Sequence, residues 1–225
     1  NEEMSDIIKE AENQMYREKM RNSRYHKKNL LAFLEETLFT HTDETRDHID
    51  RIYHMGQRLS ASLALEHTDS DDLRLLSLFH DIGTIAIKGS ILKKKDRLSE
   101  IEWEEIKKHP DTGYRIADSI KEIAHLADYI LTHHEHWDGS GYPQGLKGEE
   151  IPVLSRMLAV LDAYDMMVNP KRYKMPMTHE EALLELERCS GSQFDPTMVS
   201  MFVQLMKSDT GKKQLLPSSS FLGTK

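Results

Sequence analysis

Histidine and carboxylate side chains recur through the middle of the sequence and are the residues best suited to chemistry. Imidazole nitrogen and carboxylate oxygen, without thiolate, favour iron, manganese or another borderline divalent ion over a structural zinc site. Carboxylates can also bridge two ions about 3.5–4 Å apart, and such clusters activate water for attack on phosphoesters. The candidates are five histidines and three carboxylates: Glu44, His48, His80, Asp81, His109, His133, His134 and Asp162.

Spacing alone leaves the role of several candidates open. Glu44 and His48 are four residues apart on a predicted helix and share one face, which suits two metal ligands but also an ordinary surface contact. The dipeptide His80-Asp81, taken alone, is more often structural than catalytic. Asp162 lies in an apolar helix, where a buried carboxylate needs a metal, a cap or a salt bridge.

The remaining histidines lie at predicted helix ends. Neighbours on a helix diverge by about 100°, so His133 and His134 can meet one metal pair only where the helix ends. The following segment 138–145 holds three glycines and a proline, so the helix cannot continue there. His109 precedes Pro110, and a ring at such a helix end can point into a cavity.

Composition is typical of a soluble globular protein: 38% hydrophobic residues, 30% charged residues and a mean hydropathy of −0.60. The net charge of −8 argues against binding nucleic-acid polymers through a basic face, and two cations would let such a chain hold an anionic substrate. No apolar run approaches the roughly 20 residues of a membrane span, and the polar start shows no signal-peptide pattern. The single cysteine, Cys189, fits a reducing compartment.

Helical periodicity dominates the chain, so we predict an all-α fold. Thr42 or Asp43 is expected to cap a long helix. Capping boxes at Ser99–Glu102 and Thr178–Glu181 open two more. The basic stretch 84–98 is expected to be an irregular loop. The predicted helices cover about 30–39, 43–65, 69–81, 99–109, 111–119, 121–134, 154–167, 179–190 and 196–206.

We expect three parts in the chain: an N-terminal helix over 1–26, one domain over 27–208, and a flexible tail over 209–225. A heptad seam opens the N-terminal helix but lasts barely two heptads. It fits a solvated helix docked on the body and, equally, a dimerising stalk from an upstream sensor domain, which would make the protein a homodimer. The seam consists of Met4, Ile8, Ala11 and Met15.

Several motifs follow one another in a fixed order. They are His80-Asp-Ile-Gly83, Lys107-Lys-His-Pro110, His133-His-Glu-His-Trp-Asp-Gly-Ser-Gly-Tyr-Pro143, Leu161-Asp-Ala-Tyr-Asp165 and Phe194-Asp-Pro196. In this order they resemble the HD-GYP family, HD-superfamily phosphodiesterases that hydrolyse cyclic di-GMP. The resemblance spans roughly Thr42 to Phe202. It implies an HD-domain helical bundle with C-terminal HD-GYP helices, to which the N-terminal helix is added.

The resemblance also implies a metal centre of two or three divalent ions, Fe or Mn. One ion is matched by His48, His80, Asp81 and Asp162. The second is matched by Asp81, His109, His133 and His134. Glu44 matches a ligand of the trinuclear members. A hydroxide bridging the ions would attack phosphorus and open cyclic di-GMP to pGpG, then GMP, with Asp81 and His80 as the catalytic pair.

Substrate and partner contacts are implied in the same way. The GYP loop of the family lies beside the active site and has been linked to GGDEF cyclase partners. The family also places the enzyme in the bacterial cytoplasm. The implied substrate-binding positions are Thr84, Gly141, Tyr142, Pro143, Lys171 and Lys174.

The chain departs from the family pattern at a few positions. Thr84 stands where the family usually has a lysine thought to touch the scissile phosphate, and segment 87–90 departs from the usual Ile-Pro-Asp. His136 replaces a common arginine or lysine, and Arg172 a usual proline. Thr84 and the changes in segment 87–90 favour a rival hypothesis, a weak or inactive module that binds a cyclic dinucleotide, whereas the complete set of metal ligands favours the enzyme. Lys88 or one of the lysines in 93–95 could supply the missing charge, and cyclic GMP-AMP is an alternative substrate.

Overall fold

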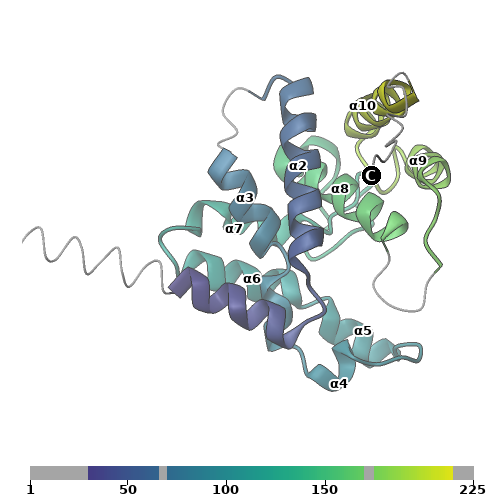
Figure 1. The fold of residues 1–225 in the computed structure, drawn as a ribbon. Helices are drawn as coiled ribbons and strands as arrows, with labels where there is room; N and C mark the ends of the chain where they lie inside the picture. The colour runs from purple at the N-terminus through teal and green to yellow at the C-terminus, as the bar shows by residue number, and fades with distance from the viewer. Residues whose placement is uncertain (1–29, 66–69, 170–174, 215–225) are drawn as a thin grey trace, which may run out of the picture.

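The computed structural model describes residues 30–65, 70–169 and 175–214, which form a bundle of helices (Figure 1). Among these residues there is no β-strand, and one isolated bridge joins Ser190 and Phe194. The predicted all-α class is confirmed. The helices are 30–41, α2 (Arg46–Ser62), α3 (Ser70–Phe79), η1 (Ile82–Ala86), α4 (Gly89–Leu92), α5 (Glu100–Ile106), α6 (His109–Asp118), η2 (Ala124–Leu126), α7 (Ala127–Thr132), η3 (Gly148–Glu150), α8 (Val153–Val168), α9 (His179–Arg188) and α10 (Pro196–Gln214).

The core lies around α2, which packs against both α3 and α8, while α6 packs against α7 and η1. Figure 1 shows α2 near the middle of the bundle, α9 and α10 together at the upper right, and α4 and α5 at the bottom of the view. Ile52, Phe79, Ile130, Leu161 and Phe202 are fully buried from five different helices. Burial of each such side chain contributes roughly 1.5–3 kcal/mol, so the core fixes how the helices cross.

The start of α2 differs from the sequence prediction. Thr45 is the N-cap, because its side-chain oxygen accepts a hydrogen bond from the His48 main-chain N–H. The Thr42 hydroxyl instead donates to the Leu38 carbonyl at 2.7 Å and so closes the preceding helix. The predicted cap at Thr42 or Asp43 is therefore wrong, and Glu44 lies just before α2 rather than on it.

Other boundaries also differ. The stretch 84–98, expected to be a loop, contains the end of η1 and the short helix α4. The helix from Ser99 ends at Ile106, and His109 begins α6, since a proline is tolerated in the first turn of a helix. The last helix continues to Gln214, eight residues past its expected end.

Both predicted capping boxes are present, at Ser99 with Glu102 and at Thr178 with Glu181. None of the described helices is both long and apolar enough to span a bilayer. The predicted helix over 1–26, the residues Lys171, Arg172 and Lys174, and the tail beyond Gln214 lie outside the described residues.

Candidate metal centre

The eight predicted metal ligands come from distant parts of the chain and converge in two groups of donors. In each group, one ligand atom per residue lies within 4.8 Å of the ligand atoms of the others. The first group consists of Asp81, His109, His133 and His134, and the second of Glu44, His48 and His80. Asp162 on α8 joins the second group, with Oδ1 3.3 Å from His48 Nε2. Helix ends supply most of these residues, because α3, α6 and α7 all begin or end at this place.

Asp81 lies between the histidines. Its Oδ1 is 3.2 Å from His109 Nε2 and 3.5 Å from His133 Nε2, and its Oδ2 is 3.9 Å from His80 Nε2. Burial raises the pKa of this carboxyl, but the neighbouring imidazoles, His80 first and then His109 and His133, hold the pKa well below its usual range. An ionised carboxylate whose two oxygens face different histidines has the form of a bridging ligand.

Gly83 allows the close approach that places Asp81 beside α6. A Cβ on Gly83 would lie 1.9 Å from the His109 carbonyl oxygen and 2.6 Å from the Gly113 nitrogen. Both atoms belong to the main chain and cannot move aside without displacing α6. The glycine of the His-Asp-Ile-Gly motif therefore keeps the donors of η1 and α6 within reach of one another.

Three histidine rings are oriented by main-chain carbonyls. The Nδ1 atoms of His80, His109 and His133 lie 2.9, 2.8 and 2.6 Å from the carbonyl oxygens of the residues three positions earlier. Those carbonyls lie in the last turns of α3, α5 and α7, where helix carbonyls lack intrahelical partners. Since a carbonyl only accepts, Nδ1 carries the proton, and in the neutral ring Nε2 presents a lone pair to the centre.

The Nε2 atoms that face inward have one another and the carboxylates of the centre as their polar neighbours. His48 Nε2 and His80 Nε2 are buried without a hydrogen bond, and His109 Nε2 lies 3.3 Å from His133 Nε2. Two lone pairs that face each other repel, and a buried acceptor without a donor is costly. Divalent cations between these atoms would remove both costs, so the donors fit the metal centre that the sequence predicts.

The charge states favour ligation. Burial lowers the pKa of His133 and of His134, so both rings are neutral. Burial also lowers the pKa of His48, but the neighbouring carboxylates of Asp162 and Asp165 outweigh it and raise the pKa to about 9 in the absence of metal. A proton therefore occupies the His48 side of the centre until a cation replaces it.

Comparison with known proteins agrees with this geometry. The sequence profile described as "HD domain" matches residues 4–198. The chain belongs to the HD domain family. A relative named "Cyclic di-GMP phosphodiesterase" from Thermotoga maritima is 39% identical over 169 residues, which are 74% of this chain and 46% of the relative. A relative named "3'3'-cGAMP-specific phosphodiesterase 2" from Vibrio cholerae is 34% identical over 179 residues, which are 79% of this chain and 34% of the relative.

Solved structures share the fold. A cyclic GMP-AMP phosphodiesterase from V. cholerae aligns with a TM-score of 0.60 and 22% identity, over 82% of this chain and 51% of that one. A protein titled HDG"Y"P from Bdellovibrio bacteriovorus aligns with a TM-score of 0.55 and 21% identity, over 71% of this chain and 51% of that one. The HD-GYP assignment made from the motifs is confirmed. This chain spans about half the length of these relatives, or less.

The GYP loop of this HD domain lies directly against the donors. Tyr142 stacks on His134, with ring centroids 5.0 Å apart and planes at 27°. Burial, followed by the charges of Asp81 and Asp162, raises the pKa of Tyr142 far above its usual value, so the phenol stays protonated. A Cβ on Gly141 would lie 2.2 Å from the His136 nitrogen, which explains the glycine before the tyrosine.

Glu135 holds the far side of this loop, and the sequence analysis gave it no role. Its carboxylate is buried and accepts three main-chain N–H groups: Gln144 at 2.7 Å, Gly145 at 3.1 Å and Leu146 at 3.1 Å. The residue follows the two histidines directly. Its place between the ligand pair and the glycine-rich loop is the signal that could have identified it.

The positions where the chain departs from the family can also be located. The Thr84 hydroxyl donates to the Asp81 carbonyl at 2.6 Å, so this side chain braces the turn after the His-Asp pair. Of the lysines proposed to replace the missing charge, Lys94 is paired with Glu102 at 2.6 Å. Lys88 lines a groove of about 420 Å³ whose wall includes His109.

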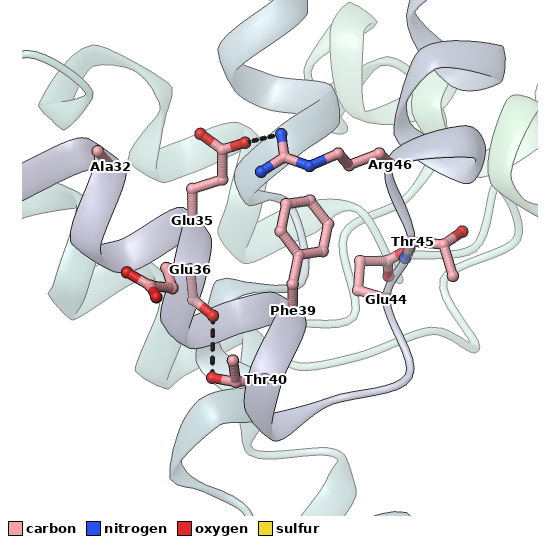
Figure 2. Close-up of a pocket in the computed structure, with 8 residues that line it drawn as sticks. All are labelled: Ala32, Glu35, Glu36, Phe39, Thr40, Glu44, Thr45 and Arg46. Carbon is pink, nitrogen blue, oxygen red and sulfur yellow. Dashed lines mark hydrogen bonds and ion pairs between the residues drawn. The ribbon is translucent and has the colours of Figure 1, made fainter.

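Glu44 lies where helix 30–41 meets the start of α2. It lines a groove of about 570 Å³ with side chains of both elements (Figure 2). In this view Arg46 pairs with Glu35 and lies over the ring of Phe39, with 4.7 Å from the guanidinium carbon to the ring centroid. Helix 30–41 therefore lines the same groove as the predicted metal ligand Glu44.

Proposed function

We propose that this HD domain hydrolyses the phosphodiester bonds of cyclic di-GMP to give linear pGpG, and then GMP. The observation that carries the proposal is the Asp81 carboxylate, whose Oδ1 faces the Nε2 atoms of His109 and His133 and whose Oδ2 faces that of His80, so that it lies between the two donor groups. The names of the relatives support the substrate class. The ions proposed are Fe or Mn, because the donors are nitrogen and oxygen only.

The two donor groups would hold separate ions. One ion would be held by Asp81, His109, His133 and His134. The other would be held by His48, His80 and Asp162, with Asp81 as the ligand common to both ions. Bound cations would activate water and neutralise charge on the phosphate. Glu44, 3.6 Å from His48 Nε2, is the residue proposed to add a third ion.

The chain's own residues would orient the substrate. Tyr142 keeps its proton and stacks on His134, so its hydroxyl can donate a hydrogen bond to a phosphate oxygen held beside that histidine. Glu135 fixes the main chain that carries the tyrosine. Lys171 and Lys174 are proposed to hold the phosphate or the guanine, as in the family.

A second candidate function is binding without turnover. Position 84 carries a hydroxyl that is already used by the main chain, so the positive charge expected beside the scissile phosphate is missing at this position. Cyclic GMP-AMP is the alternative substrate, supported by the name of the V. cholerae relative. We further propose GGDEF proteins as partners of the GYP loop, dimerisation through residues 1–26, and action in the bacterial cytoplasm.

The test is product analysis. Purified protein is loaded anaerobically with Mn(II) or Fe(II), incubated separately with cyclic di-GMP and with 3'3'-cyclic GMP-AMP, and the nucleotides are separated by chromatography. Asp118→Asn, which removes an exposed carboxylate at the end of α6, is the control for Asp81→Asn. Linear product that disappears only in Asp81→Asn supports hydrolysis. Binding of nucleotide without product contradicts hydrolysis and favours the binding module.

A further inference from the structure

One ligand of the centre is oriented differently from the others. His48 lies in the first turn of α2, where the Thr45 carbonyl three residues earlier already accepts the Ile49 N–H. No free helix-end carbonyl is therefore at hand for its Nδ1. That nitrogen faces Asp165 Oδ2 of α8 at 2.6 Å, across 117 residues of sequence.

Asp165 is itself held by several donors. Arg51 approaches with two nitrogens, Nε at 2.5 Å from Oδ1 and Nη2 at 2.9 Å from Oδ2, and Asn169 Nδ2 lies 2.9 Å from Oδ1. Only 1% of Asp165 is exposed, so water cannot replace these partners. Arg51 also balances the carboxylate charge, which makes the buried pair tolerable beside a cation site.

Helix α8 thus contacts both nitrogens of one imidazole. Asp162 and Asp165 are three residues apart and share a face, and they lie 3.3 Å from His48 Nε2 and 2.6 Å from His48 Nδ1, respectively. The first carboxylate belongs to the donors. The second lies on the far side of the ring and cannot reach the centre.

We propose that Asp165, held by Arg51, is a positioning residue that fixes His48 with Nε2 directed at the metal, so that a side-chain pair controls one half of the centre. The other half, with His109 and His133, is oriented by main-chain carbonyls that no substitution removes. The inference rests on the proposed metal centre. It predicts that one substitution weakens one ion site and leaves the other intact.

The first test is Asp165→Asn, which keeps the size of the side chain. The amide carries no charge, and in either orientation its NH₂ group faces two of the four donors that the carboxylate now accepts. At the Oδ2 position it opposes His48 Nδ1 and Arg51 Nη2, and at the Oδ1 position it opposes Arg51 Nε and Asn169 Nδ2, so the set of contacts that holds the ring is broken in both cases. Mn(II) is the probe, and its stoichiometry and affinity are measured by elemental analysis and calorimetry. We expect one site to weaken about 10- to 100-fold, with the other site unchanged.

The matched control is Asp195→Asn, which also breaks a buried aspartate–arginine pair. Asp195 bonds Arg156 at 2.7 Å at the start of α10, outside both donor groups. It should lower the thermal midpoint without changing Mn(II) binding. If Asp165→Asn does not fold, Arg51→Met takes its place, because Arg51 is only partly buried, and Arg51→Lys should recover part of the affinity.

A readout without metal separates the two proposals. In metal-free protein, ¹⁵N correlation spectra should show the Nδ1–H of His48 in a hydrogen bond to the Asp165 carboxylate, a signature that Asp165→Asn abolishes because the carboxylate is gone, and that Asp195→Asn leaves unchanged. Wild-type Mn(II) binding and an unchanged His48 signature in Asp165→Asn would overturn this inference alone. Wild-type protein that binds no Mn(II), yet shows the His48 signature lost in Asp165→Asn, would overturn the proposed function and leave the orientation by Asp165 standing.

Discussion

Glu135 provides a sensitive test of how the GYP loop is held. Its two oxygens accept the N–H groups of Gln144, Gly145 and Leu146 at 2.7–3.1 Å. Each hydrogen bond to a charged group contributes about 1.5–3 kcal/mol. Glu135→Ala removes all three, but water can reach the exposed Gln144 and Gly145, so we expect the loop to lose roughly 2–4 kcal/mol of local stability rather than the full sum.

The assay is native-state hydrogen exchange at these three amides. A loss of that size corresponds to exchange about 30- to 1000-fold faster, since each 1.4 kcal/mol is a factor of ten. Glu135→Gln keeps one accepting oxygen and turns an amide donor towards the remaining N–H, so its effect should be smaller but clear. Glu149→Gln, on the exposed η3 turn nearby, is the control. Wild-type exchange rates in Glu135→Ala would refute the account of the loop.

Four further outcomes are expected. Asp81→Ala should lose at least one metal equivalent by elemental analysis, and full metal content with full activity would contradict its bridging place. Gly83→Ala should destabilise the fold by roughly 3 kcal/mol or more, because its Cβ would lie 1.9 Å from a main-chain oxygen. Gly89→Ala, with open space around it, should be neutral or stabilising by up to about 1 kcal/mol. Thermal unfolding measures both changes in stability. Thr84→Lys should raise turnover if a cation is what position 84 lacks, and unchanged turnover excludes that explanation. The pKa of His48 is raised from 6.5 to about 9, so protonation of this ring stabilises metal-free protein fully below pH 6.5, and that stabilisation is lost as the pH rises through about 9. Between these two pH values, Mn(II) binding should release a proton from His48. Calorimetry in two buffers of different ionisation enthalpy measures this release.

Local signals were predicted well because the partners lie within one helical turn. Each capping box joins a side chain to a main-chain N–H three residues away, so Ser99–Glu102 and Thr178–Glu181 could be read directly and are present. The cap of α2 was misassigned for the same local reason. Thr42 and Thr45 are both capable caps, and the choice between them depends on where the preceding helix ends.

In the candidate site, too, residue types and local motifs could be predicted from the sequence, whereas long-range contacts could not. Its eight donors could be named from the residue types and the family motifs, and so could the absence of thiolate ligands among them. Helical spacing alone does not distinguish the two carboxylates of α8, because Asp162 and Asp165 share a face of one helix, and only the family motif named Asp162 as the ligand. Only the ring of His48, which α2 places between them, separates a donor to the centre from the residue that orients the ring.

The amino-acid sequence by itself determined the helical class, the two capping boxes and the set of imidazole and carboxylate groups available for a metal. Tertiary structure alone decided that His48 is oriented by Asp165, that Glu135 fastens the loop, and that Gly83 must lack a side chain. The physical reason is the distance along the chain between the residues that interact. Caps, periodicity and the carbonyls that orient three of the rings are neighbours within one helical turn, whereas the orientation of His48 depends on how α2 packs against α8, which brings together residues more than a hundred positions apart.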